Sequence, residues 1–192
     1  MDITTFNNLA HRLPSNISVL MRGPTGVGKS QLAFHCAKVL GLPLIDVRGS
    51  TMDESKVTGI PDFLVSKEQG VATFVLPSWF VRACREPVVL FLDELNRASP
   101  AVLNGLMPLL DHRRQSWIEE RGQYVTVGGG TLFLATTNVG ARYVGASPVD
   151  MALEDRFSRE IEMGYLKPDQ ESKLLLRRVP GLSQAHADHL AD

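Results

Sequence analysis

The chain has 192 residues, of which 44% are hydrophobic and 21% are charged. These proportions are typical of soluble globular domains, and they exclude fibrous, low-complexity and intrinsically disordered proteins. Lys and Arg number 20 against 21 Asp and Glu, which gives a formal net charge of −1. A chain without a general basic field would need a local patch to contact nucleic acid.

Two features of the sequence favour a cytoplasmic location. The two cysteines, Cys36 and Cys84, lie in apolar helical segments outside any CxxC or Cys/His cluster, which is typical of reduced, buried thiols. Residues 1–14 are too polar for a signal peptide, and no uncharged apolar run approaches the roughly 18 to 20 residues that span a bilayer. We therefore expect a soluble, cytoplasmic protein that makes no membrane contact.

Short apolar runs alternate with longer stretches of helical period, which predicts an α/β fold with helices on both faces of a parallel sheet. Strands are expected at 17–21, 44–47, 88–92 and 131–136. The run at 88–92 contains no polar residue, as expected for a central strand that is buried on both faces. Helices are expected at 29–40, ended by Gly41, and at 100–110, with Ser99 as N-cap.

Two insertions interrupt this alternation. Apolar segments at 63–65 and 71–76 flank a polar turn that contains glycine, and they predict a β-hairpin. Segments at 117–118 and 123–127 predict a second hairpin in the same way. Aromatic residues near these hairpins either contact a polymeric substrate or pack against their own domain; they are Phe63, Phe74, Trp79, Trp117 and Tyr124.

The character of the sequence changes near Pro168, after which only helices are predicted. These helices cover 169–178 and 183–192, with a break at Val179-Pro180-Gly181 between them. We therefore divide the chain into a core of residues 1–166 and a small helical part of residues 167–192.

A phosphate-loop pattern, G-x-x-x-x-G-K-[ST], begins where the first predicted strand ends. Its residues are Gly23, Pro24, Thr25, Gly26, Val27, Gly28, Lys29 and Ser30. Glycines let successive N–H groups face one anion, and the N-terminus of the following helix adds partial positive charge. We expect Lys29 to reach the β- and γ-phosphates and the Ser30 hydroxyl to ligate Mg²⁺. The segment therefore predicts a nucleotide-binding site.

Two acids, Asp93 and Glu94, directly follow the predicted central strand. Because parallel strands end at one edge of a sheet, both carboxylates should lie beside the phosphate loop. We expect Asp93 to hold Mg²⁺, directly or through water, and Glu94 to orient and polarise the attacking water. Asn138 follows the strand at 131–136, and its amide would help to fix that water if the two strands are neighbours. An Asn at a strand end is otherwise a common turn residue.

Together these segments resemble those of AAA+ ATPases, and most closely the MoxR-like group related to dynein-type and McrB-type modules. That group typically writes DE-x-NRA, which appears here at 93–98, and the segments at 134–138 and 153–157 also match. The resemblance covers essentially the whole chain, hairpins included. It implies a P-loop NTPase fold, a three-layer αβα sandwich around a central parallel sheet, with ATP and Mg²⁺ as ligands. Because such proteins carry a full helical lid, the resemblance also implies that residues 167–192 form a partial lid, which is either truncated or naturally minimal.

The resemblance also assigns Arg156 as an arginine finger that acts on the nucleotide of the next subunit. Arg159 is the substitute candidate, placed one helical turn later. A salt bridge from Arg156 to a neighbouring acid is the alternative that the residues themselves favour. A finger used in trans implies a homo-oligomeric ring, most often a hexamer. Arg177 and Arg178 are expected to be solvated or interfacial and not to contact nucleotide.

These observations predict a Mg²⁺-dependent ATPase. By resemblance, a MoxR-like ring remodels or activates a protein partner, such as one with a von Willebrand factor A domain or a metal-enzyme domain. A DNA-directed motor of the branch-migration or McrB-like type would share every catalytic motif and is the alternative reading. A small P-loop kinase is the minor alternative, because such kinases usually lack the paired acids and the Asp-Arg-Phe segment that stands at 155–157 here.

Overall fold

The computed structural model describes residues 14, 17–118, 123–138 and 151–191. Five parallel strands form the central sheet in the order β2-β5-β8-β1-β9. They are β1 (Ser18–Gly23), β2 (Leu44–Arg48), β5 (Val89–Asp93), β8 (Leu132–Asn138) and β9 (Arg159–Glu162). The first four lie within two residues of the predicted strands, and β5 and β8 are neighbours. The fifth strand, β9, was not predicted.

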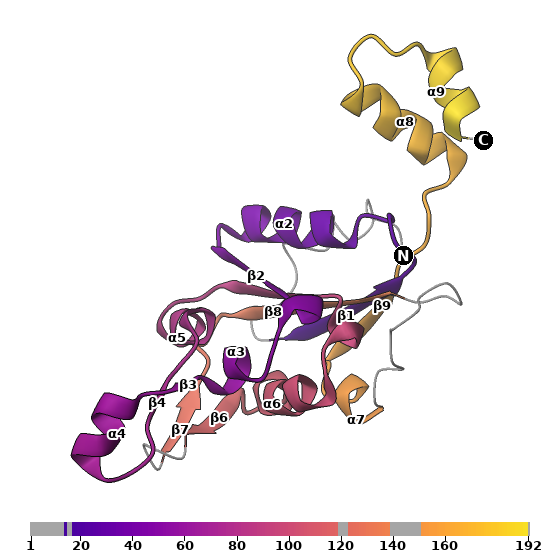
Figure 1. Ribbon diagram of the computed structural model, residues 1–192. Coiled ribbons are helices and arrows are strands. Elements are labelled where there is room, and N and C mark those ends of the chain that lie inside the picture. The colour runs from indigo at the N-terminus through magenta and orange to yellow at the C-terminus, as the bar shows by residue number, and fades with distance from the viewer. Residues whose placement is uncertain (1–13, 15–16, 119–122, 139–150, 192) are drawn as a thin grey trace.

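Helices cover both faces of this sheet, so the predicted three-layer sandwich is confirmed (Figure 1). Helix α2 (Lys29–Leu40) lies on one face, and α5 (Ser78–Arg85) and α6 (Pro100–Leu110) lie on the other. Successive residues of β1 point to opposite faces, so Val19 packs with α2 while Leu20 packs with α5 and α6. Both half-cores are buried, because a parallel sheet in this architecture has no solvent-facing side.

The two long core helices begin and end where the sequence predicts. Gly41 has φ 66°, a left-handed conformation that glycine adopts without strain, and its N–H reaches the last carbonyls of α2. At the start of α6, the Ser99 side chain accepts a hydrogen bond from the N–H of Val102. Pro100 occupies the first turn, where its missing N–H leaves no hydrogen bond unmade.

The first insertion differs from the predicted hairpin. It contains η1 (Gly49–Thr51), α3 (Ser55–Thr58), β3 (Ile60–Pro61), α4 (Phe63–Gln69) and β4 (Phe74–Val75). The predicted strand at 63–65 is wrong, because those residues form the first turn of α4. Asp62 caps that helix by accepting hydrogen bonds from the N–H groups of Leu64 and Val65. An antiparallel pair is present, but it joins β4 to β3.

The second insertion is the predicted hairpin. Strands β6 (Gln115–Ile118) and β7 (Gln123–Thr126) pair in antiparallel register, and the turn between them lies outside the described residues. Trp117 and Tyr124 pack edge to face with ring centroids 5.0 Å apart, and both side chains remain exposed. The remaining short elements are η2 (Leu95–Arg97) after β5 and α7 (Met151–Glu154) before β9.

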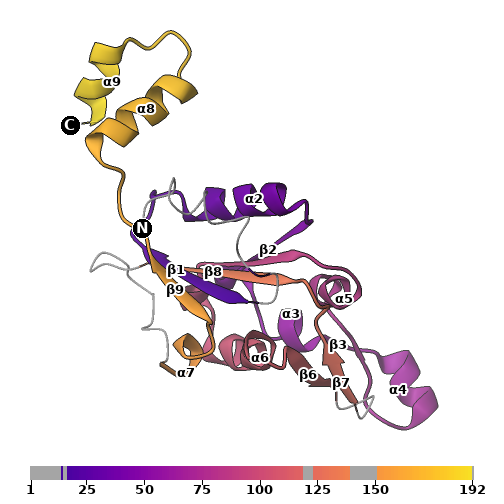
Figure 2. The same cartoon turned by 180° about the vertical axis from the view of Figure 1, so that it is seen from behind.

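Helices α8 (Pro168–Arg178) and α9 (Gln184–Ala191) form a pair that stands apart from the sheet, beyond one end of α2 (Figure 2). Polar bonds join the pair: the buried Ser172 hydroxyl donates to Asp188, and the Gln184 amide donates to both side chains. No helix in the described part of the chain has both the length and the apolar character that crossing a membrane requires.

Candidate nucleotide site

The phosphate loop connects the end of β1 to the start of α2. Gly28 directly precedes α2 with φ 90°, a conformation that favours glycine. Gly23 passes so close to the backbone of Met163 that a Cβ would collide with that carbonyl oxygen. Lys29 is buried, and its Nζ donates to the carbonyl oxygens of Gly23 at 2.8 Å and Pro24 at 2.7 Å. The loop therefore holds an ammonium group among its own carbonyls.

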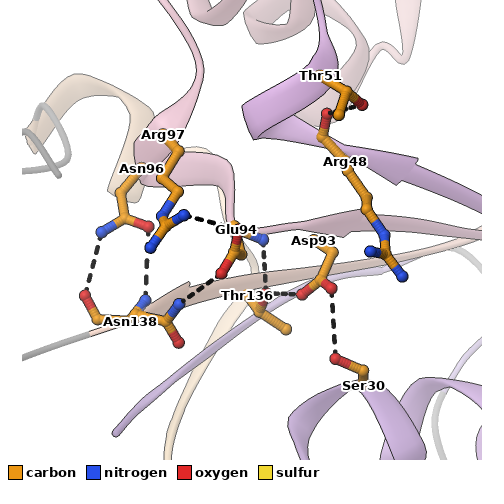
Figure 3. Close-up of polar contacts among 9 residues, drawn as sticks. All are labelled: Ser30, Arg48, Thr51, Asp93, Glu94, Asn96, Arg97, Thr136 and Asn138. Atoms are coloured by element: carbon orange, nitrogen blue, oxygen red, sulfur yellow. Dashed lines mark hydrogen bonds and ion pairs between the residues drawn. The ribbon is translucent and has the colours of Figure 1, made fainter. Parts of the chain in front are cut away.

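Asp93, at the end of β5, contacts side chains from both α2 and β8 (Figure 3). The Ser30 hydroxyl at the start of α2 donates to Asp93 Oδ2 at 3.3 Å. The Thr136 hydroxyl on β8 donates to Asp93 Oδ1 at 2.6 Å and accepts the N–H of Glu94 at 2.9 Å. A hydroxyl and a carboxylate side by side are hard oxygen donors of the kind that Mg²⁺ prefers.

Glu94 and Asn138 meet across the ends of β5 and β8. The Asn138 amide nitrogen donates to Glu94 Oε1 at 3.1 Å. Glu94 has φ 50° and ψ 47°, a left-handed conformation that is uncommon outside glycine and that is often found at functional sites. Arg97 Nη1 lies 3.5 Å from the other carboxylate oxygen of Glu94. The structure therefore brings the two predicted hydrolysis residues into direct contact.

These groups line one cavity of about 280 Å³. Its walls are Thr25, Gly26, Gly28, Lys29, Ser30, Gln31, Asp93, Glu94 and Asn138. The phosphate loop forms one wall, and the ends of β5 and β8 form the other. The described residues hold no cluster of three or more His, Cys, Asp or Glu that could bind a metal alone. A metal here would therefore also need oxygens from phosphate or water, which is the usual pattern for Mg²⁺.

A second cavity of about 580 Å³ continues from the first, and the two share Gly26, Gly28 and Gln31. Helix α8 closes its far side with Arg177 and Arg178. Arg178 Nη2 donates to Gln31 Oε1 at 3.5 Å. Both arginines are exposed, as the sequence suggested, and they line this cavity together with residues 26–28 of the phosphate loop.

The charge of Asp93 affects the pKa of a carboxyl group on the neighbouring strand. Asp46 lies on β2, which pairs with β5. Burial raises the pKa of the Asp46 carboxyl above its ordinary value, and Asp93 raises it further, while Arg48 acts in the opposite direction.

Arg156 lies at the opposite end of β1 from the phosphate loop. It lines a separate cavity of about 470 Å³ together with Ser18, Leu110 and Arg114. Glu154 and Glu160, two acids close to Arg156 in the sequence, form ion pairs with Arg22.

The substitute candidate, Arg159, opens β9 and does not continue a helix. The side chains that sequence reasoning missed are Thr136, Asn96 and Arg97. The Thr-Thr-Asn run at 136–138 and the DE-x-NRA segment at 93–98 are the sequence features that could have identified these side chains.

A protein family model and several curated proteins match most of this chain. Residues 18–157 match the family model described as AAA domain, dynein-related subfamily. An uncharacterized protein of Staphylococcus epidermidis is 31% identical over 169 residues, which are 88% of this chain and 63% of that protein. One from a bovine strain of Staphylococcus aureus is 32% identical over the same shares. The chain therefore spans less than two thirds of these curated relatives.

Solved structures share the fold. A candidate ATPase from Cytophaga hutchinsonii superposes with a TM-score of 0.64 at 20% identity, covering 98% of this chain and 56% of that one. The RuvB Holliday junction branch migration motor of Thermotoga maritima gives a TM-score of 0.62 at 17% identity, covering 98% and 54%.

Proposed function

Because the chain belongs to the dynein-related subfamily of AAA domains, we propose that it binds ATP with Mg²⁺ and hydrolyses it to ADP and phosphate. The observation that carries the proposal is the cavity of about 280 Å³ in which phosphate loop, Asp93, Glu94 and Asn138 converge. Kinases and hydrolases share such a loop. A carboxylate held by an amide at the neighbouring strand end is suited to a water molecule as acceptor of the phosphoryl group.

Each proposed role follows from the position of the side chain. The N–H groups of residues 25–28 and of the start of α2 would face the phosphates, and Lys29 would exchange its carbonyl partners for phosphate oxygens. Ser30 and Asp93 would hold Mg²⁺, and their 3.3 Å contact supports this pairing. When bound, the ion would neutralise charge on the β- and γ-phosphate oxygens.

Glu94 is proposed to orient the attacking water and to accept its proton. Asn138 is proposed to contact both the γ-phosphate and that water. Their direct hydrogen bond at 3.1 Å supports a shared task, because two groups that fix one water must lie within one hydrogen-bond shell of each other.

Arg156 is proposed to act on the ATP of the adjacent subunit. β1 has six residues and therefore spans roughly 17 to 20 Å. Because Arg156 lies beside the start of this strand, its side chain cannot reach the loop at the far end. A planar guanidinium could instead stabilise the spreading negative charge in a neighbour's site. Head-to-tail contacts of this kind close into a homo-oligomeric ring, which we propose to be a hexamer.

We further propose that such a ring remodels or activates a protein partner, such as one with a von Willebrand factor A domain. The net charge of −1 favours a protein over DNA. The likeness to the RuvB branch migration motor, at 17% identity, is a likeness of fold. Stimulation of the ATPase by duplex DNA at physiological salt would instead support a DNA-directed motor.

Binding and turnover of ATP by the purified chain test the proposal. Wild type should bind a fluorescent ATP analogue in a Mg²⁺-dependent way and release phosphate. Lys29→Ala should lose binding, and Glu94→Gln should bind ATP and retain it, with only a small residual rate of hydrolysis. The proposed hydrolytic role is wrong if Glu94→Gln turns over at the wild-type rate. Nucleotide binding itself is excluded if wild type and Lys29→Ala bind the analogue equally weakly.

A further inference from the structure

The turn that follows β5 contacts both of the side chains that we propose for hydrolysis. It is the short helix η2, Leu95–Arg97, and it supplies the N and R of the DE-x-NRA segment. Neither Asn96 nor Arg97 lines the phosphate cavity. Both side chains point back at residues that do (Figure 3). The proposed nucleotide chemistry leaves these two residues without a role.

Asn96 binds the main chain of Asn138 at two points. Its amide nitrogen donates to the Asn138 carbonyl oxygen at 3.1 Å, and its amide oxygen accepts the Asn138 N–H at 3.4 Å. Asn96 is only 6% exposed, so water competes little for these bonds. The last residue of β8 is therefore held by the turn after β5, and its side chain is aimed at Glu94 from a fixed backbone.

Arg97 engages the carboxylate oxygen of Glu94 that Asn138 does not contact. The turn closes through a bond from the Arg97 N–H to the Glu94 carbonyl oxygen at 2.9 Å. This brings the guanidinium back over Glu94, with Nη1 at 3.5 Å from Oε2. Since Asn138 donates to Oε1 at 3.1 Å, each carboxylate oxygen has its own cationic or amide partner.

The main chain of Glu94 is fixed independently of these contacts. Its N–H donates to the Thr136 hydroxyl at 2.9 Å. Its carbonyl oxygen lies against Gly49 so closely that a Cβ on that glycine would be 2.5 Å away. With the backbone fixed on both sides, only the side-chain torsions of Glu94 are free to vary. Arg97 and Asn138 are the groups that restrain those torsions.

We infer that Asn96 and Arg97 are positioning residues that hold Asn138 and Glu94 in one fixed arrangement in the lining of the phosphate cavity. This inference rests on the proposed ATPase function, because it assigns roles around Glu94. It predicts that losing either residue lowers the rate of hydrolysis and leaves ATP affinity nearly unchanged. Small displacements of a reacting group can cost up to about a hundredfold in rate.

The test compares Arg97→Ala and Arg97→Lys with wild type in steady-state hydrolysis and in equilibrium binding of an ATP analogue. Arg97→Ala should reduce kcat roughly ten- to hundredfold with the Kd within about twofold of wild type. Arg97→Lys keeps a cation near Oε2 and should recover most of that loss. Arg82→Ala is the matched control, because Arg82 forms a comparably exposed surface pair with Glu86 away from the cavity. It should leave kcat unchanged.

A double mutant distinguishes positioning from a general loss of structure. If Arg97 acts through the Glu94 carboxylate, then adding Arg97→Ala to Glu94→Gln should not lower the residual rate any further. Asn96→Ala should lower kcat as Arg97→Ala does, and its thermal unfolding is recorded alongside. Because Arg97 is partly exposed, its variants report on the inference even if the Asn96 variant fails to fold.

The outcomes separate this inference from the proposed function. If wild type hydrolyses ATP and Arg97→Ala does so at the same rate, the positioning role is wrong and the ATPase stands. The positioning role is also wrong if Arg97→Ala slows the Glu94→Gln variant as much as it slows wild type. If wild type fails to hydrolyse ATP, the ATPase proposal itself is wrong.

Discussion

Two adjacent threonines of β8 occupy very different chemical environments. Both side chains are almost fully buried, with exposed fractions of 1% for Thr136 and 2% for Thr137. The Thr136 hydroxyl links Asp93 to the N–H of Glu94. The Thr137 hydroxyl has no hydrogen-bond partner among the described residues. A buried polar group without a partner costs free energy, so these two positions should respond in opposite ways to loss of the hydroxyl.

Replacing each threonine by valine, which has nearly the same shape, tests this contrast. Thr136→Val leaves the Glu94 N–H without its hydroxyl acceptor and removes the donor to Asp93 Oδ1, so we expect a stability loss of about 1 to 3 kcal/mol. We also expect slower ATP hydrolysis, because Asp93 would no longer be oriented toward Ser30. Thr137→Val should be neutral or slightly stabilising. Urea denaturation and phosphate release measure both effects, and equal destabilisation by the two variants would contradict the argument.

The site was predictable from the sequence to the extent that its chemistry depends on local patterns. Lys29 and Ser30 follow glycines at fixed spacing, and Asp93 and Glu94 end an apolar run, so each is visible in a single segment. Thr136 was not predictable, because its partners lie 42 and 43 positions away and are brought near only by the pairing of β5 with β8. The bonds of the DE-x-NRA turn to Asn138 depend on the same pairing.

At the scale of elements, two predictions from the sequence differ from the structure: residues 63–65 form a helix instead of a strand, and strand β9 was not predicted. Phe63, Leu64 and Val65 are apolar and partly β-branched, which favoured a strand, yet the Asp62 side chain caps them as a helix. An Asp before the segment and Gly70 after it were the available helix signals. Strand β9 was missed because its residues, Arg-Glu-Ile-Glu, are mostly charged. It is an edge strand, and only its pairing with β1 defines it.

The contact between η1 and the turn after β5 gives an element-scale prediction. Gly49→Ala would place a methyl group 2.5 Å from the Glu94 carbonyl oxygen, which is backbone and cannot rotate away. We expect a loss of about 1 to 3 kcal/mol in unfolding free energy, together with slower hydrolysis as Glu94 shifts. Gly129→Ala is the matched control, since a Cβ there meets nothing within 4 Å. Similar melting temperatures and rates for the two variants would show that the contact is not restrictive.

The stability of the helix pair α8 and α9 should fall at acid pH because of one carboxylate, that of Asp188. Hydrogen bonds from Ser172 and then Gln184 hold the pKa of Asp188 below its ordinary value of 3.8. A lowered pKa in the folded state means that the stabilisation is present above pH 3.8 and disappears as the pH falls through the lower, folded value. Hydrogen exchange of residues 168–191, corrected for intrinsic rates, should therefore lose protection on acidification.

The Asp188→Asn variant shows whether this carboxylate is responsible. Its exchange in the same helices should already be faster at pH 5 and should change less on acidification. Asp169→Asn serves as the control, because Asp169 forms an exposed pair with Lys173 at 3.9 Å, which contributes little to stability. A wild-type profile that Asp188→Asn reproduces would assign the acid sensitivity to other groups.

At the scale of the whole molecule, the order of the sheet decides what one subunit can do alone. Strands β5, β8 and β1 are consecutive, so the phosphate loop, the two acids and Asn138 gather at one edge. Arg156 lies beside Ser18 at the other edge. Among the described residues, the nucleotide site therefore lies at one end of β1 and the Arg156 guanidinium lies at the other, where it could serve another subunit. The alternating sequence pattern predicts parallel strands. Because the strands are parallel, the nucleotide site gathers at one end of the sheet, away from Arg156 at the other.

Mixing two inactive variants tests whether this separation is used between subunits. Arg156→Ala should bind ATP with an affinity within a few-fold of wild type and fail to hydrolyse it, and Glu94→Gln should also be inactive. A junction that joins an Arg156→Ala site to the Arg156 of a Glu94→Gln subunit contains every required group. If subunits exchange freely at equal amounts, about a quarter of the junctions have this composition. The mixture should therefore regain phosphate release.

Two further measurements make the mixing result decisive. Light scattering shows whether ATP brings the subunits into a closed ring. A mixture of Lys29→Ala with Glu94→Gln should stay inactive, because both changes damage the same side of the junction and no intact site can form. If the first mixture also stays inactive while rings form, then Arg156 acts within its own subunit or not at all. The head-to-tail ring would then need a different basis from the one that the position of Arg156 suggests.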